Sequence, residues 1–324
     1  MQSPSQAYNR KPYLYGILMA GIGSMLFSGK AILVKLAFAY GANAETLLAL
    51  RMLMALPLFW AIFWWESHRK EMSPITWIDR LKLFSLGFLG YFLSSYVDFL
   101  GLQYISVGLE RIVLYLTPTI VLLISYFVLK KPISRLQWYA LIVGYLGVFI
   151  VFIQDASSTG ISAWLGMILV FGSACSYAIY MIGAGEMVKR IGSVRLVVYA
   201  SSASAVFSVL QSSWHDPYAI FNQLPQIYWF SLLNASLCTV IPMLLIMIAI
   251  NRIGSPLVSQ AGIVGPVSTI FMGYLILSEP ITWTQIGGMM LVIAAMWLLV
   301  RNDAPRKKSP DKKSDDFDGA EPLN

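Results

Sequence analysis

The sequence is poor in charged residues, histidine and cysteine, and each shortage excludes a class of protein. Charged residues make up only 12% of the 324 residues, about half the share of roughly 25% that soluble domains carry. Hydrophobic residues make up 57%. This composition excludes an ordinary soluble protein and indicates a chain that lies mostly in lipid.

The two histidines and two cysteines offer no metal or catalytic cluster. His68 and His215 lie in different connections between apolar segments, whereas Cys175 and Cys238 lie inside such segments, where cysteine usually serves as a small packing residue. No HExxH, Walker or glycine-rich phosphate motif occurs in the sequence. We therefore predict no metal, no cofactor and no enzyme activity, although a membrane-embedded enzyme with a buried serine or aspartate site remains an alternative.

Long apolar runs recur along the whole chain. Each is close to the ~20 residues that a helix needs to cross a hydrocarbon core about 30 Å thick, and the alternation typical of a membrane β-barrel is absent. The predicted fold class is therefore an all-α membrane protein with ten transmembrane helices. These helices are predicted at residues 13–37, 43–65, 81–104, 107–129, 135–153, 163–185, 195–213, 227–250, 255–277 and 281–300.

Basic residues are missing from five of the connections between spans. When basic residues at the edges of spans are counted with the neighbouring connections, four of the 23 lysines and arginines lie within predicted spans, and the other 19 all lie in tails and connections on one side of the membrane. Because lysine and arginine stay in the cytoplasm during insertion, both termini are expected there, with residues 1–12 and 301–324 as tails and the second tail disordered. The net charge of +7 then reflects topology and anionic lipid headgroups rather than nucleic acid.

The second half of the sequence repeats the first. Residues 101–153 align without a gap on residues 249–301, and Pro118 matches Pro266. Each half has five spans, an odd number, so the halves are expected in opposite orientations, as in secondary transporters that work by alternating access. We expect the two prolines to kink their helices and act in gating, although static packing kinks would leave the same pattern. The predicted halves are residues 13–153 and 163–300.

Three short stretches carry a family resemblance: Phe27-Ser28-Gly29 running on to Lys35, Leu50-Arg51, and Ser278-Glu279-Pro280-Ile281. In these stretches and in the order of its spans, over residues 13–300, the chain resembles the EamA-type ten-span carriers of the drug/metabolite transporter superfamily. The resemblance implies the fold and a bacterial inner membrane, while the composition would also suit an organelle. Such carriers move amino acids, nucleotide sugars, vitamins or drugs, so the fold does not set the cargo.

Six ionisable residues inside the predicted spans are candidate site residues, all in the non-cytoplasmic part of the first half: Lys30, Lys35, Arg51, Asp98, Glu110 and Arg111. An ionisable group at the bilayer centre costs about 2.5–3.5 kcal/mol on insertion scales, so it normally faces a cavity or a partner. We expect Lys35 to snorkel or pack near its span end, and Arg51 to pair with Asp98 or Glu110 or to contact cargo. One of the adjacent residues Glu110 and Arg111 would reach the headgroups. Four cations against two anions favour cargo with a carboxylate or phosphate, while the acids would bind an amine or take protons.

Polar residues at helical spacing would complete a binding site. They are Tyr91, Ser95 and Asp98 on the third span, Ser173, Ser176, Tyr177 and Tyr180 on the sixth, and Ser231, Asn234 and Cys238 on the eighth. The predicted substrate-binding residues are Lys30, Arg51, Tyr91, Asp98, Glu110, Arg111, Tyr177, Tyr180 and Asn234. The alternative is that the polar side chains only form interhelical hydrogen bonds and close packing.

Together these features predict a secondary transporter that moves a small amphoteric or anionic, amino-acid-like metabolite, with export as the favoured direction. The alternatives are an uptake carrier for a vitamin, a nucleotide-like compound or another organic solute, broad drug efflux, or a membrane enzyme, channel or receptor. The expected partners are the small-molecule substrate, the lipid bilayer and protons as coupling ion. We expect no nucleic acid, and either a monomer or a homodimer.

Overall fold

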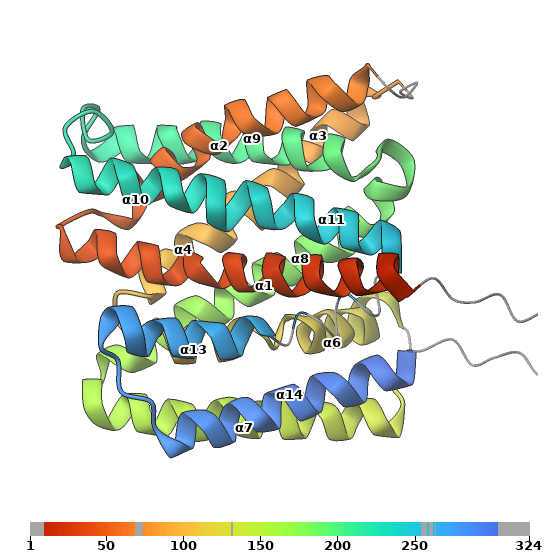
Figure 1. Cartoon of the computed structure of the whole chain (residues 1–324), viewed down its shortest axis with the longest axis vertical. Helices are drawn as coiled ribbons and strands as arrows, with labels where there is room; N and C mark the ends of the chain where they lie inside the picture. The colour runs from red at the N-terminus through yellow and green to blue at the C-terminus, as the bar shows by residue number, and fades with distance from the viewer. Residues whose placement is uncertain are drawn as a thin grey trace, which may run out of the picture.

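The computed structural model describes residues 10–68, 74–130, 132–253, 258, 262 and 264–303. Within these ranges the chain is helical and contains no strand, which confirms the predicted all-α class. Residues 1–9 of the predicted N-terminal tail lie outside the described residues, and so do residues 304–324 of the predicted C-terminal tail. Figure 1 shows the helices running roughly side by side, with the start of α1 and the end of α14 on the same side of the bundle.

The described helices are α1 (Arg10–Ala39), α2 (Ala44–Ser67), α3 (Trp77–Gly87), the π-helix η1 (Phe88–Leu93), α4 (Ser94–Gly101), α5 (Val107–Leu114), α6 (Thr117–Leu129), α7 (Arg135–Thr159), α8 (Ser162–Ile191), α9 (Ser193–His215), α10 (Pro225–Ala235), the π-helix η2 (Ser236–Val240), α11 (Ile241–Ile253), α13 (Val264–Leu277) and α14 (Trp283–Asp303). Several of these helices follow one another with little or no interruption, as in α3–η1–α4, α5–α6 and α10–η2–α11.

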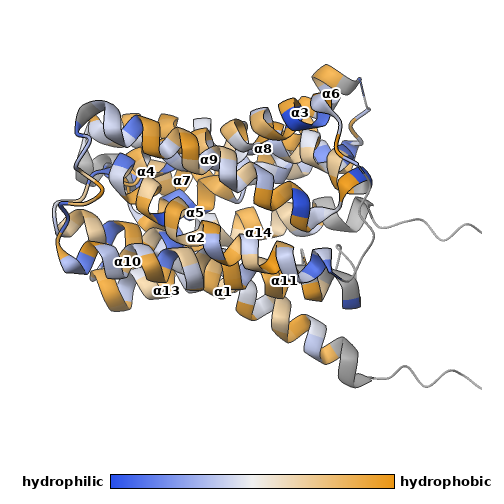
Figure 2. Cartoon of the chain, turned by 90° about the horizontal axis from the view of Figure 1, so that it is seen from above, coloured by the Kyte–Doolittle hydropathy of each residue, from blue (hydrophilic) through white to orange (hydrophobic). Residues whose placement is uncertain are grey.

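Eight helical stretches in the described part of the chain are long and apolar enough to cross a membrane. The first of these stretches is Leu14–Ala39 and the eighth is Pro225–Ile246. Each of the eight overlaps one of the first eight predicted spans. Two shorter apolar helices follow, Val264–Leu277 and Trp283–Leu298. Hydrophobic ribbon predominates along the helices, and hydrophilic ribbon gathers at several helix ends and connections (Figure 2). The chain is therefore a multi-pass membrane protein.

Helix boundaries recur at a constant distance along the chain. α3 begins at Trp77 and α10 at Pro225, which are 148 positions apart. The π-helices η1 and η2 begin at Phe88 and Ser236, again 148 positions apart. A π turn inside a helix is rare, so its occurrence at equivalent positions is a specific feature that two unrelated hydrophobic helices would not share.

The turns between helices recur at the same distance. Lys130 and Ser278, 148 positions apart, are the two described non-glycine residues with a positive φ, at 53° and 56°. Four residues after Lys130, the backbone N–H of Ser134 donates to the Gln137 side chain at 2.8 Å. The corresponding backbone N–H of Thr282 donates to the side chain of Gln285 at 3.4 Å. These hydrogen bonds cap the helices α7 and α14 and fix where both begin.

The closest helix pair is α7 with α14, which together form one edge of the bundle (Figure 1). Their backbones meet at two glycines: a Cβ built on Gly288 would lie 2.5 Å from the carbonyl oxygen of Gly147, and one built on Gly147 would lie 2.6 Å from that of Gly288. Small residues at such crossings allow the close backbone approach on which helix association in lipid depends. The neighbouring Gly287 has open space at the same position.

These two adjacent glycines make a matched test of the α7–α14 contact. We expect Gly288→Ala to force the helices apart and to lower the free energy of unfolding by about 1–3 kcal/mol, as overpacking does. Gly287→Ala should be neutral or stabilising by up to about 1 kcal/mol, because alanine is the better helix former. Thermal denaturation of both purified variants checks this, and equal melting temperatures would contradict the packing described.

Candidate functional site

Three ionisable side chains from three helices meet inside the bundle. The Lys30 ammonium on α1 lies 2.5 Å from Oδ2 of Asp98 on α4 and 3.9 Å from Oε1 of Glu110 on α5. Their side chains are 9%, 1% and 0% exposed, so water screens the charges little. A buried ion pair needs good geometry and further hydrogen bonds to offset the free-energy cost of its desolvation. Here one ammonium lies within ion-pair distance of two carboxylates.

Glu110 is placed by the start of α5. Ser106 caps this helix by accepting a hydrogen bond from the backbone N–H of Leu109 at 3.1 Å. The cap holds Glu110 in the first helical turn, where the helix dipole favours a negative charge. Neither carboxylate oxygen of Glu110 accepts a hydrogen bond within the described part of the chain. Glu110 is thus a fully buried acid, and the shared Lys30 ammonium lies within ion-pair distance of it.

Arg51 on α2 lies beside this cluster without joining its ion pairs. Its Nη2 donates to Ser95 Oγ at 2.8 Å, and its guanidinium carbon lies 4.9 Å from the centre of the Phe99 ring. The Arg51 Nε has no hydrogen-bond acceptor among the described residues. Of the two predicted roles of Arg51, an ion pair with Asp98 or Glu110 is therefore not formed among the described residues, where both acids pair with Lys30 instead.

Arg111 connects the first half of the chain to the second. Its Nε donates to Thr269 Oγ1 on α13 at 3.1 Å, its Nη2 donates to the Phe27 carbonyl at 3.4 Å, and its guanidinium carbon lies 5.6 Å from the Phe27 ring centre. Arg111 is 6% exposed and Glu110 is 0% exposed, so neither reaches the headgroups as we expected for one of them. α5 accommodates both because other helices surround it.

Lys35 leaves the cluster and forms a separate contact. Its ammonium donates to Glu279 Oε1 at 2.9 Å, with side chains 24% and 20% exposed. The Glu279 carboxylate also accepts from the Val107 backbone N–H, at 3.2 Å to Oε2. Lys35 therefore has a carboxylate partner instead of snorkelling, and this Lys35–Glu279 clasp joins α1 and the start of α5 to the segment after α13.

The predicted tyrosines form a group of their own. The Tyr180 hydroxyl on α8 donates to the Tyr91 hydroxyl on η1 at 3.5 Å, and their ring centres lie 5.4 Å apart. Tyr177 lies against Tyr180, also at 5.4 Å between ring centres, and is 38% exposed. Among the described residues no hydrogen bond connects these tyrosines to the Lys30 cluster, so they form a separate group.

The predicted serines of α8 hydrogen-bond to backbone. Ser173 donates to the Ser94 carbonyl at 2.7 Å and Ser176 to the Leu89 carbonyl at 2.8 Å, which is the interhelical bonding named as their alternative role. Asn234 is 4% exposed, and its Oδ1 has no donor among the described residues.

The two prolines lie close to helix starts. Pro118 is in the first turn of α6, directly after the turn at Tyr115 and Leu116, and Pro266 is the third residue of α13. Proline fits the first turn because its missing N–H has no partner to lose there. Pro118 therefore begins a helix after a break, and does not bend a continuous one.

Four contact residues were not predicted as site residues: Phe27, Phe99, Thr269 and Glu279. The two phenylalanines stand among 17 in the sequence, and Thr269 is an ordinary polar residue of a span. Glu279 lies between two predicted spans, where an acid carries no energetic signal. Only its place in the Ser278-Glu279-Pro280-Ile281 stretch could have singled it out.

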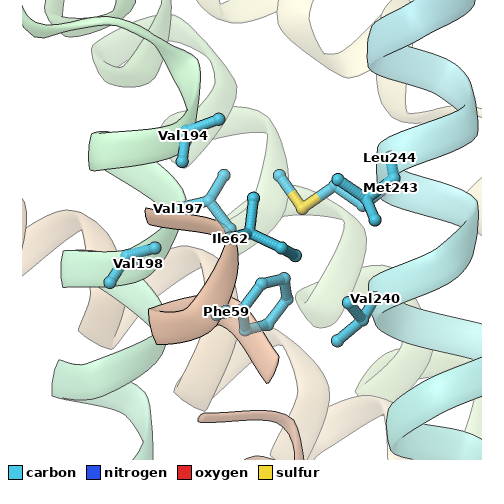
Figure 3. A pocket seen from close by; sticks show the side chains of 8 residues that line it. All are labelled: Phe59, Ile62, Val194, Val197, Val198, Val240, Met243 and Leu244. Carbon is cyan, nitrogen blue, oxygen red and sulfur yellow. The ribbon is translucent and has the colours of Figure 1, made fainter. Parts of the chain in front are cut away.

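An apolar pocket lies away from these polar groups. It lies between α2, α9 and the η2–α11 segment, and its lining side chains are hydrocarbon apart from one methionine sulfur (Figure 3). The lining residues are Phe59, Ile62, Val194, Val197, Val198, Val240, Met243 and Leu244. None of the predicted binding residues lines this pocket, so it cannot orient a polar cargo.

Comparison with known families decides what kind of protein carries this arrangement. The model of the EamA-like transporter family matches the chain twice, over residues 14–153 and 164–301. The chain belongs to the EamA-like transporter family. An EamA-like protein is a membrane transporter and not an enzyme, which agrees with the absence of catalytic motifs from the sequence.

Relatives of this EamA-like transporter extend over nearly the same length. The chain is 30% identical over 291 residues to the uncharacterized transporter YcbK of Bacillus subtilis, covering 87% of this chain and 92% of YcbK. It is 25% identical over 249 residues to the uncharacterized transporter YoaV of Bacillus subtilis, covering 75% of this chain and 82% of YoaV. A solved crystal structure matches with a TM-score of 0.61 at 14% identity, over 89% of this chain and 98% of that one, which shows a shared fold.

The Lys30 cluster of this EamA-like transporter predicts an order of stability effects. We expect Asp98→Asn to lower the free energy of unfolding by about 3–5 kcal/mol, because it removes the nearest charge partner of a buried ammonium. Glu110→Gln should cost less, since Lys30 keeps its shorter contact to Asp98. Thermal denaturation in detergent compares the two variants, and a Glu110→Gln protein less stable than Asp98→Asn would reverse the assignment of the primary ion pair.

Proposed function

We propose that this protein is a secondary transporter that moves a small polar metabolite carrying a negative charge, amphoteric or anionic, by alternating access. The observation that carries the proposal is the charge balance of the buried cluster. Lys30, Arg51 and Arg111 are 7%, 5% and 6% exposed, and the acids Asp98 and Glu110 are 1% and 0% exposed. Three buried cations thus face two buried anions.

The excess is one positive charge, smaller than the excess of two expected from the sequence. The difference is Lys35, whose partner Glu279 lies outside the predicted spans. An uncompensated charge inside a membrane protein is costly, so the site is best neutralised by an anionic group of the cargo. Arg51 is the natural contact, because its Nε donor has no acceptor and no carboxylate lies within ion-pair distance of its guanidinium among the described residues.

The architecture proposed is ten spans in two inverted five-helix repeats, residues 13–153 and 163–300. The two matches of the family model and the offset of 148 between helix boundaries, π turns and caps support it. The two shorter apolar helices, Val264–Leu277 and Trp283–Leu298, would complete the ninth and tenth spans. An odd number of spans per repeat inverts one repeat relative to the other.

The Lys35–Glu279 clasp supports alternating access. It joins α1 to the segment after α13, 244 positions away in sequence, and so holds the two proposed repeats together at one end of the bundle. With both termini in the cytoplasm, as the basic residues indicate, this end is the non-cytoplasmic one. The conformation described would then be closed to the outside, and opening it would break the clasp.

Other aspects of the proposal follow from the site and the family. The location proposed is the bacterial inner membrane, with export as the favoured direction and uptake as the alternative. Protons are the proposed coupling ion, since Asp98 and Glu110 are acids within the cluster. Broad efflux of cationic drugs fits less well, because a site with excess positive charge repels cations. Either a monomer or a homodimer would suit this mechanism.

The anion-binding role of Arg51 makes a direct prediction. Arg51→Gln removes the spare cation, so we expect transport of the anionic cargo to fall about 10- to 100-fold, the value of a charge-assisted hydrogen bond. Uptake of radiolabelled carboxylates into proteoliposomes measures this. Arg80→Gln, at an exposed arginine of α3, is the matched control and should transport like the wild type. Equal transport by all three proteins would reject the role.

The proposed topology is open to a reporter assay. Alkaline phosphatase fused after Gly160, between α7 and α8, should be active because this connection would lie outside the cytoplasm. The same enzyme fused after Lys130, between α6 and α7, or at the C-terminus should be inactive, whereas a fluorescent protein at the C-terminus should fluoresce. Phosphatase activity at the C-terminus would contradict the even number of spans.

A further inference from the structure

Lys30 occupies a complete binding site for an ammonium group. Its Nζ lies 2.5 Å from Asp98 Oδ2 and 3.9 Å from Glu110 Oε1. It also lies 6.0 Å and 5.9 Å from the ring centres of Phe27 and Phe99. Carboxylates and aromatic faces are the groups with which proteins bind the amines of ligands. Here the amine that fills the site belongs to the chain itself.

The acids around Lys30 are built to hold a cation. Both are buried to at least 99%, and neither oxygen of Glu110 nor Oδ1 of Asp98 has a hydrogen-bond donor among the described residues. Removal of the ammonium would leave two buried negative charges, with Arg51 and Arg111 directed toward Ser95, Thr269 and the Phe27 carbonyl. The acidic pair is therefore stabilised by an ammonium, either tethered or free, unless a proton neutralises one of the two carboxylates.

Building on the proposed function, we propose that Lys30 sets the charge of the cargo: it acts as a tethered ammonium, so that the wild-type transporter takes carboxylate anions without an amine, such as 2-hydroxy acids, in preference to amino acids. The amine of an amino acid would have to displace Lys30 from Asp98 and Glu110. A tethered group competes at a high effective concentration, so a free amine at ordinary concentrations loses.

Charge balance gives the same result independently. With Lys30 present the five buried residues carry one excess positive charge, which a monoanion neutralises and a zwitterion of zero net charge does not. Without Lys30 the remaining two cations and two anions balance. A zwitterion then fits, with its ammonium in the place of Lys30 and its carboxylate at Arg51. One side chain thus separates two cargo classes of the same size.

Chemical rescue tests whether the Lys30 site binds an amine. Lys30→Ala leaves a space with the shape of propylammonium, so we expect this variant to melt at a lower temperature than the wild type and to be restabilised by propylammonium chloride in a concentration-dependent way. Propan-1-ol, of similar shape without charge, should not restabilise it. Lys35→Ala, which loses the part-exposed ammonium of the same helix, should show no propylammonium rescue. Absence of rescue in Lys30→Ala would overturn the proposal.

A double variant covers the case in which Lys30→Ala does not fold. Lys30→Ala/Glu110→Gln leaves a single buried carboxylate in place of two, so the uncompensated charge is halved. We expect the same selective stabilisation by propylammonium, through Asp98 alone. Equal effects of propylammonium and propan-1-ol on the double variant would show that the space is only an apolar cavity, and would reject the ammonium site.

Transport by proteoliposomes tests the consequence for cargo. The probes are pairs of equal size: lactate with alanine, and the 2-hydroxy acid of leucine with leucine. We expect the wild type to favour the hydroxy acid by about tenfold or more, and Lys30→Ala to shift this ratio toward the amino acid by about tenfold or more, the value of one ion pair. Arg80→Gln, at an exposed arginine of α3, should keep the wild-type ratio.

The two experiments separate the two proposals. A wild type that takes amino acids as well as hydroxy acids, or a ratio that Lys30→Ala leaves unchanged, overturns the selecting role of Lys30. No carboxylate transport by any of the proteins, together with propylammonium rescue, would reject the anionic cargo of the proposed function while keeping the ammonium site.

Discussion

A charge buried in a membrane protein needs a partner, and this requirement organises the centre of the structure. Lys30, Asp98 and Glu110 come from α1, α4 and α5, and their ion pairs hold these three helices in one arrangement. In lipid there is no hydrophobic driving force between helices, so packing and polar contacts decide which helices associate. Under the proposed function, the same contacts would also determine which charge is left over for the cargo.

The residues of this cluster were predictable from the sequence, whereas their pairing was not. Ionisable side chains inside apolar runs are conspicuous because each is costly, and the structure brings Lys30, Asp98 and Glu110 together as a consequence. Sequence position says nothing about which cation approaches which anion across helices, so Arg51 was assigned a partner that Lys30 occupies. The charge count failed for a related reason: Glu279, the partner of Lys35, lies outside the hydrophobic runs, where an acid is inexpensive and draws no attention.

The helical fold was predictable in outline, because a long apolar run in lipid has little alternative to a helix. The details that depend on hydrogen bonds were not. The third predicted span begins at residue 81, but its helix begins at Trp77, because Thr76 and Asp79 form a capping box ahead of the apolar run. The fourth span was predicted as one helix over residues 107–129, but a turn before Thr117 divides it into α5 and α6. Hydropathy locates the hydrocarbon core and does not report caps or breaks.

The backbone features shared at an offset of 148 contrast with the charges, which are not shared. Pi turns, left-handed turn residues and helix caps recur, while the position 148 residues after Glu110 is Val258 and the position after Asp98 is Ile246. These backbone features therefore occur twice among the described residues, whereas the buried ion-pair cluster occurs once. A site with its cations and acids supplied mainly by one half would bind a cargo with two distinct ends in a single orientation. In the inverted-repeat architecture proposed above, cargo selection would change by substitution in the first half alone, without disturbing the backbone features that both halves share.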